Sequence, residues 1–79
     1  MNAHAPELKG FSEREAELQR SVDECARLML KADSGELQIT ELDRLLFAEN
    51  SIRKQARELG LSSRQLELML ERKIRRLRG

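Results

Sequence analysis

Apolar side chains recur at helical spacing through most of the chain, and this periodicity is the feature that most restricts its fold. Leu18, Val22, Cys25 and Met29 follow one another at intervals of four, three and four residues, which places them on one face of an α-helix. The chain also has one Pro, four Gly and few β-branched residues, a composition that favours helices over strands. We therefore expect an all-α protein.

The size and composition of the chain limit its core and its location. A chain of 79 residues suffices for one domain and buries about 60% of the surface that its unfolded form exposes. The single cysteine, Cys25, lies among apolar neighbours and is expected to be a buried structural thiol. No apolar run approaches the roughly 20 residues of a membrane helix, and the first ten residues do not resemble a signal peptide. We expect a cytoplasmic protein without membrane contact.

The N-terminal half is predicted to contain a flexible arm and one long helix. Residues 1–11 include Pro6 and Gly10 and show no periodicity, so they are interpreted as the arm of a single helical domain that spans residues 12–79. Ser12 and Glu15 have the spacing of a capping box, which predicts a packing or dimerisation helix over residues 12–31. Gly35 follows in a turn sequence and is free to adopt a positive φ.

Two or three shorter helices are predicted after this turn, making about four in all. Thr40 and Asp43 have the spacing of a second cap. The pair Asn50-Ser51 favours a break, because both residues are poor in helix interiors, although one continuous helix over residues 40–59 remains an alternative.

The clearest boundary lies between residues 59 and 63. Gly60 is expected to end a helix as the residue just after its C-cap. Ser62 and Gln65 have the spacing of a capping box that opens the last helix, over residues 63–77.

Charge divides the chain into two halves. Residues 1–50 contain six Lys or Arg and eleven Asp or Glu, a balance of −5, whereas residues 51–79 contain nine basic and three acidic residues, a balance of +6. A basic half raises the local concentration of a polyanion such as nucleic acid. The ordinary charged surface of a helical protein is the alternative interpretation.

The segment 51–77, SIRKQARELGLSSRQLELMLERKIRRL, resembles the helix-turn-helix of LuxR/GerE output domains and sigma factor region 4. The likeness rests on apolar or small inward positions in the first helix (Ile52, Ala56, Leu59), the glycine turn and Leu61, and the capped second helix held by Leu66. Together with a scaffold helix before it, the resemblance covers about residues 40–79. Gln55 departs from the class, which commonly has an apolar residue there.

This resemblance implies a small transcriptional regulator that binds double-stranded DNA as a dimer. Ser63, Arg64 and Glu67 would read base edges in the major groove, with Arg64 suited to guanine. The side chains implied as phosphate contacts are Arg53, Lys54, Arg72, Lys73, Arg75 and Arg76. The dimer interface predicted for the first helix comprises Leu18, Val22, Cys25, Leu28 and Met29.

A protein-interaction module, such as an anti-activator, an adaptor or a secretion-type chaperone that masks a partner protein, is the alternative function. An outward-facing Leu68 and a surplus of apolar side chains at Leu28 and Leu30 favour it. An enzyme is not expected: His4 is the only histidine, and the chain has no phosphate-binding loop, no metal-ligand spacing and no activated nucleophile. No cofactor is predicted.

Overall fold

The protein is a three-helix structure organised around its first helix. The computed structural model describes the backbone of residues 5–79 and the side chains of residues 13–79. Within this range the chain forms α1 (Ala5–Asp33), α2 (Ile39–Glu58) and α3 (Ser63–Arg78), with no strand. The all-α class is therefore confirmed, but the predicted number of about four helices is wrong.

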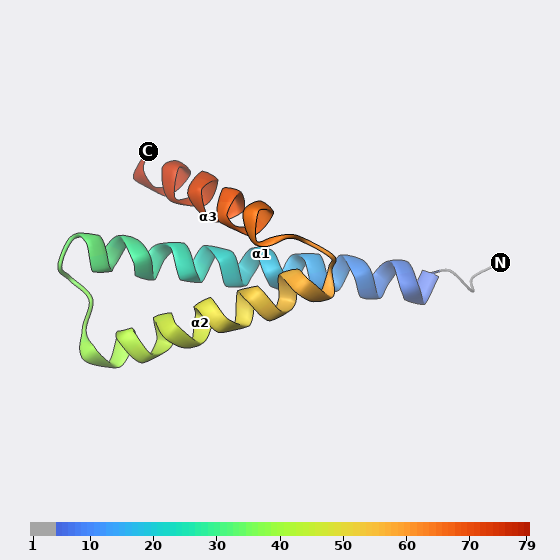
Figure 1. The fold of residues 1–79 in the computed structure, drawn as a ribbon, viewed down its shortest axis with the longest axis horizontal. Helices are drawn as coiled ribbons and strands as arrows, with labels where there is room; N and C mark the ends of the chain where they lie inside the picture. Colours follow the sequence, from blue (N-terminus) through green and yellow to red (C-terminus); the bar gives the residue numbers. More distant parts are fainter. Residues whose placement is uncertain (1–4) are drawn as a thin grey trace.

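The longest helix, α1, runs along the long axis of the molecule, and the other two pack against it (Figure 1). The connection between α2 and α3 lies beside the N-terminal half of α1, and from there the two helices diverge toward its C-terminal end. Each of them contacts α1 more extensively than it contacts the other. Helix α1 is therefore the element that holds the other two in place.

The core lies where α2 and α3 meet α1. Leu18, Val22 and Cys25 of α1 are at most 1% exposed. The buried residues opposite them come from α2 and α3 and are Leu45, Ala48, Ile52, Ala56 and Leu66. Burial raises the pKa of the Cys25 thiol to about 11, because desolvation disfavours the thiolate. Cys25 is thus a protonated apolar side chain at neutral pH, as the sequence predicted.

The predicted dimer seam is this intramolecular core. Leu18, Val22, Cys25 and Leu28 are between 0% and 5% exposed in a single chain, so they have no surface left for a second copy, and Met29 is partly buried against the same cluster. The dimer-interface assignment is therefore wrong for the four buried residues. Their spacing correctly indicated a contact face, but spacing does not reveal whether the contact comes from the same chain or from another.

The first helix begins earlier than expected. Residues 5–11, predicted to belong to a flexible arm, form the first turns of α1, whereas residues 1–4 lie outside the described residues. Pro6 is compatible with a first turn, where backbone N–H groups have no helical partner. Gly10 costs only about 1 kcal/mol relative to alanine in a helix interior. Neither residue is therefore sufficient to stop the helix.

The connection from α1 to α2 is closed by backbone and side-chain hydrogen bonds. Gly35 has φ 75°, as predicted, and the N–H of Glu36 donates to the carbonyl of Lys31 at 2.9 Å. Helix α2 is capped by Gln38 and Glu41, not by the predicted Thr40 and Asp43: the Gln38 N–H donates to the Glu41 carboxylate at 3.2 Å. The cap therefore lies two residues earlier than the sequence indicated.

An ion pair joins the two ends of this connection. The Lys31 amine lies 2.6 Å from the Glu41 carboxylate. The hydrogen bond from Lys31, followed by the one from the Gln38 backbone, lowers the pKa of Glu41 below its ordinary value. The stabilisation from a carboxyl group with a lowered pKa is complete above its ordinary pKa and is lost as the pH falls through the lowered one.

Helix α2 passes without a break through Asn50 and Ser51, so the expected interruption is absent. Both residues have only modestly unfavourable helix propensities, each less than about 1 kcal/mol. The buried residues of α2 on either side of this point, including Ala48 and Ile52, contact one continuous core. Tertiary packing along α1 thus outweighs the local preference for a turn.

The location of Val22 predicts what a buried charge would do. Val22→Glu should abolish cooperative folding, because an unpaired carboxylate in this core costs several kcal/mol, a large part of the stability of a small domain. Circular dichroism with urea titration measures the loss. Gln19→Glu, on the exposed side of the same helix, is the control and should remain folded. A folded Val22→Glu variant that only changed its oligomeric state would contradict the assignment of Val22 to the core.

Candidate nucleic-acid interface

The turn between α2 and α3 is built from backbone hydrogen bonds that depend on Gly60. Its φ is 77°, which confirms the prediction for this position. The Leu61 N–H donates to the carbonyl of Ala56 at 2.9 Å, and the Gly60 N–H donates to that of Arg57 at 3.0 Å. These two bonds form a Schellman motif, which satisfies the last carbonyl groups of a helix.

The start of α3 is held by the capping box that the sequence predicted. The Gln65 N–H donates to the Ser62 hydroxyl at 3.1 Å, and the Ser62 N–H donates to the side-chain oxygen of Gln65 at 2.8 Å. The inward positions of the predicted motif also agree with the structure, because Ile52 and Ala56 are each 2% exposed and Leu66 is 6% exposed. Residues 51–77 therefore form two helices joined by a short, defined turn.

The first turns of α3 present polar side chains to solvent. Ser63, Arg64 and Glu67 are all exposed, and the first turn contains no acidic residue. The positive end of the helix dipole is therefore not neutralised locally. Leu68 is also exposed, at 37%, and belongs to the same outer side as Arg64 and Glu71, from which it is spaced by four and three residues.

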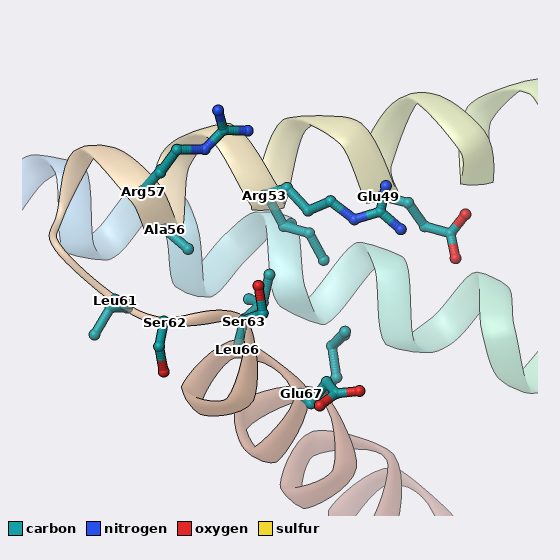
Figure 2. A pocket seen from close by; sticks show the side chains of 11 residues that line it. Glu49, Arg53, Ala56, Arg57, Leu61, Ser62, Ser63, Leu66 and Glu67 are labelled. Atoms are coloured by element: carbon teal, nitrogen blue, oxygen red, sulfur yellow. The ribbon is translucent and has the colours of Figure 1, made fainter.

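A groove of about 450 Å³ separates α2 from α3 near the turn (Figure 2). Arg53 and Arg57 contribute to its α2 side, and Ser63 and Glu67 contribute to its α3 side. The groove therefore brings the basic C-terminal half of α2 to the same side of the molecule as the start of α3. Arg57 was not among the predicted site residues, although it lies in the basic half of the sequence.

The predicted phosphate-contacting residues fall into two groups. Five side chains are exposed on α2 and α3: Arg53, Lys54, Arg72, Arg75 and Arg76. Of these, Arg75 pairs with Glu71 at 4.0 Å, an exposed contact of small energetic value. The others make no ion pair with a described side chain. Lys73 forms the second group, because it is partly buried and its amine lies 3.6 Å from Asp23 of α1.

Two ion pairs connect α3 with α1. Besides Lys73 and Asp23, Arg78 lies 3.0 Å from Asp33. A hydrogen bond from Arg27, supported by the charges of Arg27 and Lys73, lowers the pKa of Asp23 below its ordinary value. Lys73 and Arg78 therefore contact α1 at the surface, where such pairs add little stability. The contact of Lys73 with Asp23 was not predicted from the sequence.

Gln55 is the one described residue with a buried polar side-chain atom that lacks a hydrogen-bond partner. Its side chain is partly buried, and Oε1 finds no donor among the described residues. This is the position at which the sequence departs from the helix-turn-helix pattern. As a result, the first helix of the predicted motif contains a buried acceptor, Gln55 Oε1, without a donor.

The remaining observations concern other kinds of site and known relatives. No group of His, Cys, Asp and Glu side chains in the described part of the chain is arranged to hold a metal ion. None of the described helices is both long and apolar enough to cross a membrane. Comparison with protein-family models, characterised proteins and solved structures finds no significant match to the chain.

The positive φ of Gly60 makes a prediction about stability. A Cβ atom at this position would meet no atom within 4 Å, so the cost of substitution comes from backbone strain alone. Gly60→Val should lower the free energy of unfolding by about 1–2 kcal/mol or more. Gly60→Asn should lower it less, because Asn tolerates the left-handed region. Urea denaturation measures both values, and equal stability of the Val variant and the native protein would contradict the turn geometry.

The unsatisfied oxygen of Gln55 predicts a stabilising substitution. Gln55→Leu should raise the free energy of unfolding by about 1 kcal/mol or more, because it removes a buried acceptor without a donor. Gln65→Leu is the matched control and should have the opposite sign, since it deletes the capping bond to Ser62 and costs about 1 kcal/mol. A loss of stability in Gln55→Leu would show that the amide has a partner.

Proposed function

We propose that this protein is a small DNA-binding transcriptional regulator that inserts α3 into the major groove. The observation that supports the proposal is that residues 51–77 form two helices joined by a short turn, with an exposed, capped α3 beside the basic C-terminal half of α2. An α-helix fits the major groove of B-form DNA, where each base pair has a distinct pattern of donors and acceptors.

In this proposal the first turns of α3 read the bases. Arg64 is exposed, and its planar guanidinium matches the two acceptors of guanine. Ser63 donates or accepts a hydrogen bond, and Glu67 accepts one from the amino group of cytosine. An acidic residue is repelled by phosphates unless it finds such a donor. Glu67 therefore contributes to the choice of sequence and weakens nonspecific binding.

Basic side chains on both sides of α3 would contact the phosphates. Arg53 and Arg57 line the groove on the α2 side, and Glu67 lines it on the α3 side. Arg72 and Arg76 are five and nine residues beyond Glu67, which at 100° per residue places them on a different side of α3. A helix in the major groove has a phosphate backbone on each side. Basic residues on both sides of α3 can therefore each contact one of the two backbones. Such contacts supply affinity without sequence information.

The masking of a partner protein is a second candidate function, and a specific observation favours it. Helix α2 exposes several large apolar side chains, of which Ile39 and Phe47 are 86% and 74% exposed. Leu28 was predicted from the sequence to belong to such a protein contact, but it is 5% exposed and belongs to the core. Leu30 is only partly exposed. The surface that would support a protein contact is therefore on α2, with Leu68 as a separate exposed position.

Two arginine substitutions test DNA binding. Arg64→Ala should weaken binding to a selected preferred duplex by about 1–3 kcal/mol and leave random duplex almost unchanged, because it removes a base contact. Arg72→Ala should weaken binding to both duplexes and reduce the slope of log K against log salt concentration by about one unit, because it removes a phosphate contact. Fluorescence anisotropy at several salt concentrations measures both effects.

Arg44→Ala provides the matched control. Arg44 is an exposed arginine of α2 outside the basic half of the chain, so its removal should change neither affinity nor salt dependence. If all three variants and the native protein bound DNA equally weakly, and Phe47→Asp abolished capture of a protein partner, the interaction module would be the correct function instead.

A further inference from the structure

The exposed side of α2 carries an apolar surface that none of the described residues covers. Ile39, Leu42, Leu46 and Phe47 are 86%, 46%, 51% and 74% exposed, and we call these four residues the α2 apolar face. Ile39, Leu42 and Leu46 are spaced by three and four residues and form one stripe, and Phe47 is turned by about 100° from Leu46 and borders that stripe. Helix α2 is at an outer edge of the molecule in Figure 1, and the exposed fractions show that these four side chains face solvent.

The α2 apolar face is too concentrated for an ordinary solvent surface. The chain has only two Phe residues and no Trp or Tyr, and one of those two aromatic side chains is exposed here. Single exposed apolar residues are common, but a contiguous patch marks a contact site. The core residues of α2, such as Leu45 and Ile52, occupy a different side of the helix. The patch is therefore separate from the contact with α1.

The charges along the same side of α2 indicate which partner fits. One stripe at alternating spacings of four and three residues runs through positions 39, 43, 46, 50, 53 and 57. Its N-terminal part contains the acidic Asp43, with Glu36 just before the helix, and its C-terminal part contains Arg53 and Arg57. Asp43 lies within the α2 apolar face, whereas Arg53 and Arg57 follow it toward the C-terminal end of the helix.

We propose that a second copy of this chain binds to the α2 apolar face, with the two α2 helices antiparallel. This arrangement brings Leu46 and Phe47 of both copies together near a two-fold axis. It also places Asp43 of each copy toward the arginines of the other, Arg53 and Arg57. A two-fold interface requires a surface complementary to itself, and α2 meets this requirement by its charge order. A parallel pairing would place like charges together, which disfavours it.

This interface replaces the one that the sequence predicted. It shares Arg53 and Arg57 with the proposed phosphate contacts, but dimer formation and DNA binding are measured separately. The core seam of α1 stays intact in each copy, because the proposed contact uses the opposite, exposed part of the molecule. The dimer proposal and the DNA-binding proposal therefore fail separately. A dimer without DNA affinity supports only the dimer proposal, and a monomer that binds DNA supports only the DNA-binding proposal.

Sedimentation equilibrium of the native chain and two matched variants tests the proposal. The native chain should be a dimer at submillimolar concentration. Leu46→Glu should raise the dissociation constant by about tenfold or more, because it places an unpaired carboxylate at the centre of the contact. Leu68→Glu, an equivalent change on α3, should leave the dimer intact. A monomeric native chain, or a dimer that survives Leu46→Glu, would overturn the proposal.

Disulfide cross-linking then tests the antiparallel arrangement. Leu46→Cys should form a covalent dimer on mild oxidation, because position 46 of each copy lies near the two-fold axis. Ile39→Cys should not, because antiparallel pairing separates the two copies of position 39 by most of the length of the contact. Native Cys25 is fully buried and does not interfere. Equal cross-linking at both positions would show parallel pairing and overturn the arrangement. Circular dichroism confirms that each variant is folded.

Discussion

The contact of α1 with both other helices is the interaction on which the rest of the structure depends. Leu18, Val22 and Cys25 lie at the centre of a core that is completed by α2 on one side and α3 on the other. A small domain buries a limited fraction of its surface, and here α2 and α3 share few contacts of their own. Their relative orientation is therefore determined mainly by how each packs on α1 and by the turn that joins them.

This organisation explains how the candidate interface is positioned. The Schellman motif at Gly60 and the capping box at Ser62 fix the direction in which α3 leaves the turn. The later turns of α3 contact α1 at the surface, where Lys73 pairs with Asp23 and Arg78 pairs with Asp33. Hydrogen bonds and packing thus leave the side of α3 that carries Arg64 free. A rigid element with exposed polar side chains is what recognition of a groove requires.

The two proposed surfaces overlap on α2, because Arg53 and Arg57 take part in both. Its C-terminal half contributes Arg53 and Arg57 to the groove beside α3, whereas its N-terminal half carries the α2 apolar face. A single uninterrupted helix therefore links the proposed nucleic-acid contact with the proposed dimer contact. In these proposals the continuity of α2 at Asn50 fixes the distance between the two surfaces.

The sequence by itself determined the elements whose signals are local. The all-α class, the positive φ of Gly60, the Ser62 and Gln65 cap and the inward positions Ile52, Ala56 and Leu66 all follow from spacing and from the backbone preferences of single residues. Only the tertiary structure decided what each apolar face contacts. It showed that the apolar seam of α1, which includes Leu18 and Val22, is part of the core. It also showed that α2 continues through Asn50 and that Lys73 pairs with Asp23. These outcomes depend on which surfaces compete for burial in three dimensions, and periodicity along one helix contains no information about the helix on the other side of the contact.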